Sequence, residues 1–532
     1  METDIYDVAI VGCGPTGATL ANLLCRHGLK TAVFDRDTEI FHAPRAMMLD
    51  PDSCRIYQSL GIMDEMYVAD ARPFLNHRFL NPKRKPLITL DFSDVEVPYG
   101  HAAMGVMFHQ PTLEAILRSR FSDGVGIDTY LGHEVSAVTN GDEHATVSAR
   151  CARSGEETHY KARYVVGCDG GASLCRRTIG GQRIDFGYQR KWIVMDVIVH
   201  DQAVWDAIPP GSDFICQPDA AIVFVKGHRG HIRIDFEAGE ERAETFSEDD
   251  AWALIGSFMD TSSVEIIRRT PYSFYAGMPD AWRKGRLLIA GDAAHQTSPF
   301  AGQGLNMGLR DAANLAFKFD LIFRGLANDS LLDTYFEERW AHCKYLITDA
   351  SKRGKLLSLS DRKAVFKRDL AFFLGRIFPK VRKEMMRVPY RPPYRSGLLM
   401  ADAPLAGERM IQPVIEASSG EPIPLDTCLG AGFALLTTTP ETGEALDWFR
   451  TTLEGSLHVI GADLHDPSGT LTAFMAEHGV SAVLIRPDRH IFGGGDAGTA
   501  LCSALRDHLA EVHPVEQNTA ASETPAMAVA ET

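Results

Sequence analysis

Residues 5–17 decide the fold. They read Ile-Tyr-Asp-Val-Ala-Ile-Val-Gly-Cys-Gly-Pro-Thr-Gly, and a second apolar run, residues 31–35, ends at Asp35. The run 5–11 is short, apolar and rich in β-branched residues, which is typical of a buried parallel strand. Residues 15–28 predict a helix, because proline is favoured in a first helical turn, and residues 31–35 predict a second strand. This order predicts a βαβ unit in a doubly wound sheet.

The glycines of the first turn indicate a dinucleotide. Gly12, Gly14 and Gly17 allow a tight turn in which backbone N–H groups reach a pyrophosphate at a helix N-terminus. Asp35, at the end of the second strand, can accept hydrogen bonds from the hydroxyls of a ribose. Residues 493–498 repeat the glycine spacing, but no strand ending in an acid follows them, so we predict a loop before a terminal helix there. The first motif alone leaves FAD and NAD open.

A second glycine-rich segment follows a strand predicted over residues 286–290. It begins Gly291-Asp292-Ala293-Ala294-His295 and, three residues later, continues as Pro299-Phe300-Ala301-Gly302-Gln303-Gly304-Leu305-Asn306 into a helix. Asp292, at a strand end, can accept hydrogen bonds from a sugar or ribityl hydroxyl. The turn lets backbone N–H groups face an anion such as a reduced flavin ring. The alternative is an ordinary strand-to-helix turn, which leaves the density of Gly, Pro and Asn unexplained.

A third segment, Cys168-Asp169-Gly170-Gly171-Ala172-Ser173, follows a strand predicted to end at residue 167. A short acid beside glycines can contact both a bound pyrophosphate and an approaching nicotinamide nucleotide. Arg176 and Arg177 lie just beyond it. They hold either phosphates or exposed carboxylates, and the residues alone do not decide between the two.

Together the three motifs, in this order and spacing, resemble the single-component (class A) FAD-dependent aromatic hydroxylases, relatives of para-hydroxybenzoate hydroxylase and phenol hydroxylase. The likeness is strongest to the 3-(3-hydroxyphenyl)propionate hydroxylase type. It is carried also by Pro44-Arg45-Ala46, by Gln-Pro-Thr-Leu-Glu at 110–114 and by Tyr-Phe-Glu-Glu-Arg at 335–339. It covers residues 1 to about 350 with high specificity and continues more loosely to the C-terminus. There, residues 482–488 resemble the thioredoxin-like domain of the larger members, without its Cys-x-x-Cys pair.

The resemblance implies an α/β fold. A Rossmann-like FAD-binding domain would carry an inserted antiparallel β-sheet substrate domain, and a thioredoxin-like C-terminal domain without CxxC would follow. The FAD-binding domain is expected in three parts, 1–77, 105–183 and 281–400, the last with a helical region. The substrate domain is expected at 78–104 and, as its main β-sheet, at 184–280. Residues 401–513 would form the thioredoxin-like domain, and the Ala-, Glu-, Thr- and Pro-rich residues 514–532 a disordered tail.

The resemblance also implies how FAD is held. The ADP half would lie on Gly12, Gly14, Pro15, Thr16, Gly17, Asp35 and Arg36, and Asp169 would complete the nucleotide site. Gly291 and Asp292 would bind the pyrophosphate or ribityl region. The flavin ring would lie against Arg45, Gln110, Pro299, Gly302, Gly304, Leu305 and Asn306, with the last three offering N–H groups to its oxygen. NADPH or NADH would bind only transiently, as a co-substrate.

The implied reaction hydroxylates a phenolic aromatic compound with NAD(P)H and O2 through a flavin hydroperoxide. A phenol is a poor nucleophile until its proton is withdrawn, so a base should contact its hydroxyl. Asp50 is one candidate, and its alternative role is a helix cap before Pro51. Tyr275 could donate to the substrate or relay its proton, and its alternative is aromatic packing. A same-fold epoxidase, halogenase or reductase is the rival function, although no two of the six tryptophans lie two residues apart, which argues against a halogenase.

Composition sets the outer limits of function. Asp and Glu outnumber Lys and Arg by 70 to 54, which argues against nucleic acid as a partner. The sequence has no run of 18 apolar residues, so no membrane span is expected, and the acidic N-terminus is unlike a signal or transit peptide. Ten scattered cysteines without a Cys-x-x-Cys pair argue against a disulfide framework or a metal site. We therefore expect a cytoplasmic enzyme, and the family likeness alone implies a homodimer.

Overall fold

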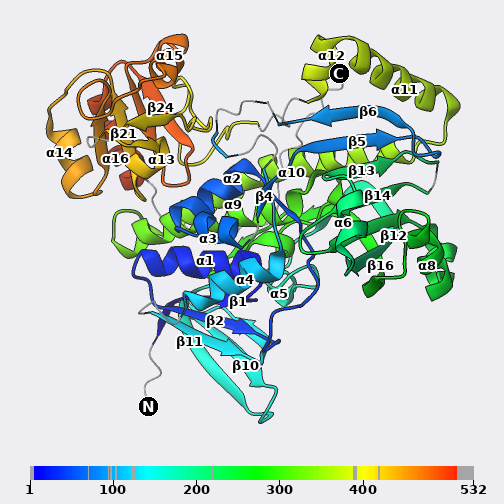
Figure 1. Ribbon diagram of the computed structural model, residues 1–532. Coiled ribbons are helices and arrows are strands. Elements are labelled where there is room, and N and C mark those ends of the chain that lie inside the picture. Colours follow the sequence, from blue (N-terminus) through cyan, green and yellow to red (C-terminus); the bar gives the residue numbers. More distant parts are fainter. Residues whose placement is uncertain are drawn as a thin grey trace.

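The computed structural model describes residues 5–69, 71–93, 95, 99–101, 105–121, 126–218, 220–386, 392–416 and 420–511. Figure 1 shows these residues in three bodies: a sheet with helices stacked above it, a second sheet at the right, and a C-terminal α/β body at the upper left. The predicted disordered tail, residues 514–532, lies outside the described residues.

The first body is built on an eight-stranded sheet with a parallel centre. Its strands are β1 (Tyr6–Val11), β2 (Thr31–Asp35), β8 (Ile127–Leu131), β9 (His133–Thr139), β10 (Ala145–Cys151), β11 (Glu157–Gly167), β17 (Arg283–Lys284) and β18 (Leu287–Ile289). The main path is β17-β18-β11-β1-β2-β8. Because β1 pairs in parallel with both β11 and β2, the predicted βαβ unit is confirmed. Every residue of β1 except Asp7 is buried, as expected of a strand covered on both faces.

Helices of the first body cover this sheet (Figure 1). They are α1 (Pro15–Arg26), α2 (Pro51–Ser59), α3 (Met63–Val68), α4 (Gln110–Ser119), α5 (Leu174–Ile179), α9 (Gln303–Phe323) and α10 (Asp333–Leu357), with the 3-10 turns η1 (Gly291–Ala293), η2 (Pro299–Ala301) and η3 (Asp329–Leu332). The long helix α9 packs against α1. Three two-residue strands, β3 (Met48–Leu49), β4 (Arg72–Pro73) and β7 (Val106–Met107), form a small sheet of their own.

The second body is a seven-stranded sheet with the order β16-β12-β15-β14-β13-β5-β6. Its strands are β5 (Asn76–Leu80), β6 (Pro86–Asp91), β12 (Arg183–Val199), β13 (Ser212–Ile215), β14 (Ile222–Lys226), β15 (His231–Glu237) and β16 (Val264–Pro279). All pairs are antiparallel except β13 with β5. Residues 76–91 and 183–279 therefore contribute strands to one sheet.

The two faces of the second sheet have different partners. Helices α6 (Gln202–Ala207), α7 (Gly239–Thr245) and α8 (Glu248–Gly256) belong to this body, and Met195, Phe224 and Phe236 point into an apolar cluster that includes α7 and α8 residues. Trp192 and Val223 face the other way, into a cluster that also contains Phe372 of α11 (Arg362–Ile377). The short helix α12 (Pro379–Met385) follows α11. This second face is turned toward the first body.

The C-terminal body contains a four-stranded sheet of order β22-β21-β23-β24. Its elements are β21 (Ala434–Thr437), β22 (Ser456–Val459), β23 (Ala482–Ile485), β24 (Ile491–Gly495), α13 (Leu425–Leu429), α14 (Glu444–Thr451), α15 (Thr470–Glu477) and α16 (Gly498–Glu511), with a small hairpin of β19 (Val414–Glu416) and β20 (Pro422–Pro424). The prediction of a loop over residues 493–498 is wrong in part, because residues 493–495 belong to β24 and α16 begins at Gly498. Within the described ranges, no helix combines the length and apolar character needed to cross a bilayer.

Candidate active site

The glycine turn after β1 packs tightly against the loop that follows β11. Gly12 has φ +101°, and a Cβ there would overlap the carbonyl oxygen of Cys168. A Cβ on Gly17 would overlap the Gly12 carbonyl oxygen, whereas one on Gly14 would meet nothing within 4 Å. The turn is therefore closed at its ends and open at Gly14, the N-cap of α1. Because the first N–H groups of a helix have no partner within it, this opening suits a pyrophosphate.

Asp35 is fixed beside this turn at the end of β2. One carboxylate oxygen accepts a hydrogen bond from the Cys13 N–H at 2.7 Å, and the other accepts from the Asp37 N–H at 2.9 Å. The Arg36 side chain is exposed and lies 3.8 Å from the Asp37 carboxylate. Asp35 therefore borders the open position at Gly14, whereas Arg36 lies at the surface.

Asp169, the third predicted nucleotide contact, supports a helix in this structure. Its carboxylate accepts hydrogen bonds from the Ser173 hydroxyl at 2.5 Å and from a backbone N–H at the start of α5. Arg176 donates to the Ala293 carbonyl at 3.0 Å, and Arg177 also donates to a backbone carbonyl. Both arginines thus bind the protein's own backbone, a role that neither sequence alternative included, and Arg176 ties this loop to η1.

The segment that begins at Gly291 closes over the first turn of α1. Gly291 has φ +62°, and a Cβ there would lie 2.8 Å from the Thr16 hydroxyl. A Cβ on Gly308 of α9 would overlap the same hydroxyl, so Thr16 is enclosed by both elements. Asp292 is exposed, yet the protein around it desolvates the carboxyl and raises its pKa, an effect that nearby cationic side chains, Arg45 among them, oppose. The first and second motifs therefore meet at α1.

The N-terminus of α9 lies beside β3. The helix begins after Gly302, which has φ +60°. The buried Asn306 carboxamide joins the two elements: its oxygen accepts from the Asp50 N–H at 3.0 Å, and its nitrogen donates to the Met48 carbonyl at 3.1 Å. The Asn306 side chain is therefore structural. Residues 303–305 lie in the first turn, where N–H groups lack helical partners and can face an anion.

The Arg45 backbone is held from two sides while its side chain stays exposed. Gln110, at the start of α4, accepts hydrogen bonds from the N–H groups of Arg45, at 3.0 Å, and of the next residue. From the second sheet, Arg233 donates to the Arg45 carbonyl at 2.6 Å, and Arg268 donates to the Pro44 carbonyl at 3.0 Å. The exposed Arg45 guanidinium is thus presented by a fixed backbone. Gln110 acts on the segment around Arg45 through these backbone contacts.

Asp196 on β12 anchors these arginines, and the sequence analysis missed all three residues. Its fully buried carboxylate lies 2.8 Å from His231 Nε2, 3.1 Å from Arg233 Nε and 2.6 Å from Arg268 Nε. Burial raises the pKa of Asp196, but the three partners outweigh it and hold the pKa below its usual range. On β15, polar residues alternate with apolar ones, a pattern typical of a half-exposed strand, although all seven residues are buried. The alternation indicates a polar face on β15, but it does not indicate that this face is buried.

Asp235 lies on the same buried face without comparable partners. Its neighbours in register are Val194 and Val223, and its Oδ1 has no hydrogen bond, with Arg233 Nε 4.0 Å away. Burial raises the pKa of Asp235 to about 7; Arg233 opposes this shift and Asp196 adds to it. A buried carboxyl that titrates near neutrality, on the sheet face turned toward Arg45, is a candidate base.

Asp50, the first sequence-predicted base, is occupied by structural partners. It is the N-cap of α2 and accepts a hydrogen bond from the Ser53 N–H at 3.0 Å. Its other oxygen forms an ion pair with Arg310 of α9 at 2.6 Å. The capping alternative is confirmed.

Tyr275, the second sequence-predicted contact, and Tyr272 lie on opposite faces of β16, since successive strand residues alternate. The Arg183 guanidinium lies 3.7 Å from the centre of the Tyr275 ring, so this tyrosine is packed. Tyr272 is half exposed and lies against Phe274. Burial raises the pKa of Tyr272, and Asp292 contributes to the shift, so Tyr272 lies within electrostatic reach of the second flavin motif.

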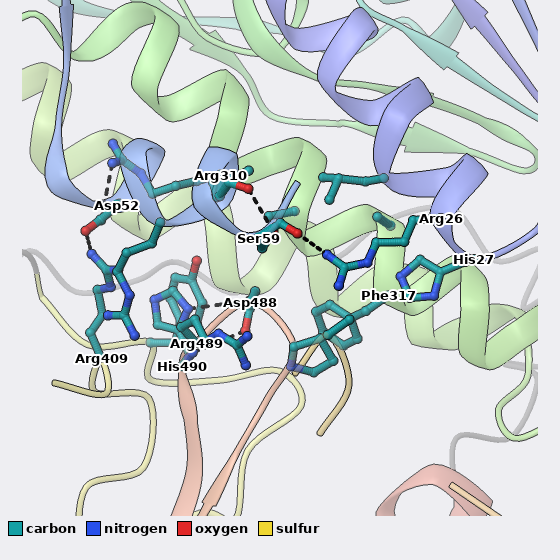
Figure 2. Close-up of a pocket in the computed structure, with 18 residues that line it drawn as sticks. Arg26, His27, Asp52, Ser59, Arg310, Phe317, Arg409, Asp488, Arg489 and His490 are labelled. Atoms are coloured by element: carbon teal, nitrogen blue, oxygen red, sulfur yellow. Dashed lines mark hydrogen bonds and ion pairs between the residues drawn. The ribbon is translucent and has the colours of Figure 1, made fainter. Parts of the chain in front are cut away.

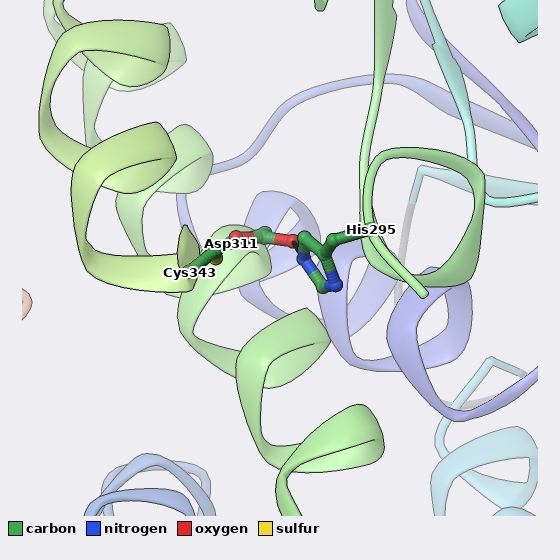
Figure 3. Close-up of side chains that lie close together, drawn as sticks. All are labelled: His295, Asp311 and Cys343. Carbon is green, nitrogen blue, oxygen red and sulfur yellow. Dashed lines mark hydrogen bonds and ion pairs between the residues drawn. The ribbon is translucent and has the colours of Figure 1, made fainter. Parts of the chain in front are cut away.

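His295, Asp311 and Cys343 form a buried cluster whose ligand atoms lie within 4.8 Å of one another (Figure 3). His295 Nε2 lies 2.6 Å from Asp311, and Arg339 binds the other oxygen of Asp311 at 2.8 Å and Cys343 Sγ at 3.4 Å. Burial lowers the pKa of His295, but Cys343 and Asp311 raise it to about 10. Because a guanidinium already binds the carboxylate and the sulfur, the cluster is a charge network. Asp311 also accepts from the Gly291 N–H at 3.0 Å, so the network holds the second motif.

Comparisons with known proteins agree with this arrangement. A family model described as the FAD binding domain matches residues 5–350. The chain is 31% identical to a protein of Rhodococcus jostii (strain RHA1) named "Probable NADH-specific resorcinol 4-hydroxylase", over 96% of both chains. It is 30% identical to the 3-(3-hydroxy-phenyl)propionate/3-hydroxycinnamic acid hydroxylase of Mycobacterium sp. (strain KMS), over 92% of this chain and 88% of that protein.

Solved structures share the fold over nearly the whole chain. Aklavinone-11 hydroxylase, solved with FAD and aklavinone, superposes with a TM-score of 0.78 at 23% identity, over 96% of this chain and 100% of that one. The flavin-dependent monooxygenase PieE, solved with FAD and substrate, gives a TM-score of 0.76 at 22% identity, over 96% and 99%. At these identities the likeness establishes a shared mixed α/β fold.

Proposed function

This chain belongs to the FAD binding domain family, and we propose that it hydroxylates a neutral phenol, with FAD as its cofactor and NADH and O2 as co-substrates. The observation that carries this proposal is the 31% identity to the probable resorcinol hydroxylase along 96% of both chains. The similarity to hydroxylases of 3-(3-hydroxyphenyl)propionate supports the same reaction class. None of the relatives named above is described as an epoxidase, halogenase or reductase.

The residues around α1 and α9 fit FAD. The opening at Gly14 would receive the pyrophosphate, and Asp35 beside it would accept the ribose hydroxyls. The first turn of α9 would face the electron-rich edge of the ring, between Arg45 and Asp292. When bound, FAD supplies the redox chemistry that activates O2 once NADH has reduced it.

We assign the phenol to the face of the second sheet that carries Asp235. This face holds the backbone of Arg45 through Arg233 and Arg268, so it adjoins the predicted ring position. The Asp235 carboxylate has an oxygen without a hydrogen bond, and this oxygen would accept a hydrogen bond from the substrate hydroxyl. Removing that proton makes the aromatic ring a stronger nucleophile toward the electrophilic oxygen.

The buried charges of this face favour a substrate without a carboxylate. Its cations, the buried Arg233 and the half-buried Arg268, are both bound to Asp196. Asp235 and Glu237 add two further buried acids on the same face. A carboxylate group brought to this face would meet like charges in a desolvated site, whereas a neutral phenol would meet hydrogen-bond acceptors.

A matched substrate pair tests the proposal. We expect resorcinol and 3-propylphenol to stimulate NADH oxidation with equal O2 uptake and to give a product one oxygen atom heavier by mass. 3-(3-Hydroxyphenyl)propionate carries a carboxylate where 3-propylphenol has a methyl group. For it we expect kcat/KM to be at least about ten-fold lower, the effect of one like-charge contact. A preference for the carboxylate substrate would disprove the neutral-phenol assignment. NADH oxidation without any oxygenated product would disprove the hydroxylase proposal.

A further inference from the structure

A cavity of about 60 Å³ lies between the first body and the C-terminal body. Figure 2 shows α1 and α9 on one side of it and the turn between β23 and β24 on the other. Five arginines line it: Arg26, Arg55, Arg310, Arg409 and Arg489. The same lining contains two carboxylates, Asp52 and Asp488. This composition is unlike that of an apolar packing defect.

Most of these charges are paired, two of the pairs across the two bodies and two within a single body. Arg55 binds both oxygens of Asp426 at 2.6 Å, Arg310 binds Asp50 at 2.6 Å, Arg409 forms an ion pair with Asp52, and Asp488 is bound by Arg486 at 2.7 Å. Arg489 has no carboxylate of its own. Its Nε lies 3.4 Å from Asp426, whose two oxygens already accept hydrogen bonds from Arg55. Leaving aside the exposed Arg26, which donates to the Ser59 carbonyl, the described residues of this cluster hold one cation more than anions.

The surplus charge is buried and directed into the cavity. Arg489 is 6% exposed, and its Nη1 has no hydrogen-bond partner; the Nε of Arg409 also has none. Burial lowers the pKa of both arginines, that of Arg409 to about 10. Arg489 also has φ +66°, in a region that few residues other than glycine adopt. The Nη2 of Arg489 donates to the Gly430 carbonyl, but a buried guanidinium nitrogen left without an acceptor is costly to the fold, and a bound anion removes that cost.

We propose that this cavity binds a phosphate-type oxyanion, held by the unpartnered nitrogens of Arg489 and Arg409. A cavity of this size takes roughly four or five water-sized groups, which matches the five heavy atoms of one phosphate. Guanidinium groups bind phosphate oxygens through paired N–H donors. Because both arginines belong to the C-terminal body and α1, α2 and α9 to the first, the anion would join the two bodies.

Two sources can supply this chemistry, free inorganic phosphate or the phosphoryl end of a larger compound. The exposed side chain of Arg26, which also lines the cavity, marks the side from which a phosphoryl group would enter. Competition separates the two sources. If ADP displaces phosphate with higher affinity, the phosphoryl group of a larger compound is the occupant, and if it does not, free phosphate is.

The test uses the FAD-loaded enzyme, so that the predicted pyrophosphate site is filled. Titration with inorganic phosphate, followed by calorimetry and by 31P line broadening, should give one site per chain. Arg489→Gln and Arg409→Gln should each weaken binding about ten- to a hundred-fold, the effect of losing a charged hydrogen bond. Arg506→Gln, which removes one charge from the surface of the same body where Arg506 pairs with Glu444 at 3.1 Å, should leave it unchanged.

Two outcomes would overturn the proposal. One is the absence of saturable phosphate binding by the wild-type enzyme. The other is binding that neither Arg489→Gln nor Arg409→Gln weakens more than Arg506→Gln does. Using two cavity variants guards against a folding defect in either, and the flavin spectrum reports whether each retains its FAD. Because the readout is binding rather than turnover, it is independent of the substrate of the enzyme.

Discussion

Two buried charged surfaces meet the FAD-binding helices, and they differ in the sign of the charge that is left over. On the second sheet, Asp196 is bound by His231, Arg233 and Arg268, whereas Asp235 on the neighbouring strand keeps an oxygen without a hydrogen bond. At the C-terminal body, the carboxylates have arginine partners, whereas Arg489 keeps an unpartnered nitrogen. The first surface has a surplus acid and the second a surplus cation.

This difference distinguishes buried charges that stabilise the fold from buried charges that bind a ligand. A buried charge with complete partners holds elements together, and its removal leaves those partners uncompensated. A buried charge with an incomplete set is costly, so its retention suggests a ligand of complementary character. By this reasoning, Asp196 and Asp426 are structural, Asp235 accepts a proton, and Arg489 accepts an anion.

Removing the surplus acid should have the largest effect. We expect Asp235→Asn to lower kcat for phenol hydroxylation by about a hundred- to ten-thousand-fold, because the variant cannot accept the substrate proton. Wild-type kcat/KM should rise as the pH passes about 7, where the Asp235 carboxyl ionises, and this rise should be missing in the variant. Stopped-flow and steady-state assays of oxygenated product over pH 5–9 measure both.

The comparison variant is at Tyr275, the second substrate contact predicted from sequence. Tyr275→Phe should change kcat less than about three-fold, because Tyr275 packs against Arg183 on the opposite face of β16. If Asp235→Asn retains FAD and hydroxylates at the wild-type rate, while Tyr275→Phe does not, the division between the two faces is wrong.

Removing a fully partnered acid from either surface should instead cost stability. We expect Asp196→Asn to lower the free energy of unfolding by about 3–5 kcal/mol, since the buried Arg233 and the half-buried Arg268 would lose their anion. Asp426→Asn at the other surface should lower the free energy of unfolding by a similar amount, because it leaves the buried Arg55 without its anion. Only Asp196→Asn should also weaken FAD binding, because its arginines hold the Arg45 backbone. Thermal unfolding and FAD titration of both variants test this, and equal FAD affinities would remove the link between Asp196 and the cofactor.

The sequence predicted those parts of the molecule that depend on local patterns. The first βαβ unit, Gly12, Asp35 and the segment from Gly291 follow from short apolar runs and glycines that sit next to each other in the chain. The cap at Asp50 was also within reach, because a cap precedes its own helix. Residues 493–495 were misread because glycines suggest a loop, whereas here they allow close approach: a Cβ on Gly494 would lie 3.1 Å from the Pro404 carbonyl oxygen.

The charged surfaces were out of reach because their partners are distant in sequence. Arg55 and Asp426 are 371 residues apart, and no spacing rule connects them. Alternating polar residues such as those on β15 are typical of a solvated face, but here the first body covers that face and all seven residues are buried. Burial of this kind depends on how the domains pack together, and the alternation of residues along one strand does not predict it.

The smallest expected effect concerns stability, and it has the opposite sign to loss of an ordinary ion pair. Asp235 has a folded pKa of about 7, above that of an unfolded aspartate, so the folded protein holds a proton that the unfolded chain releases between about pH 4 and 7. Stability from this group therefore falls as the pH rises through that window.

Asp235→Asn cannot ionise, so at pH 8 its Tm should exceed that of the wild type by a few degrees, and the gap should close toward pH 5. Glu237→Gln, on the same strand and face, should show no such gain, since Glu237 has an ion pair with Arg190 at 3.3 Å. A lower Tm for Asp235→Asn at pH 8 would mean that Asp235 is a satisfied structural acid like Asp196.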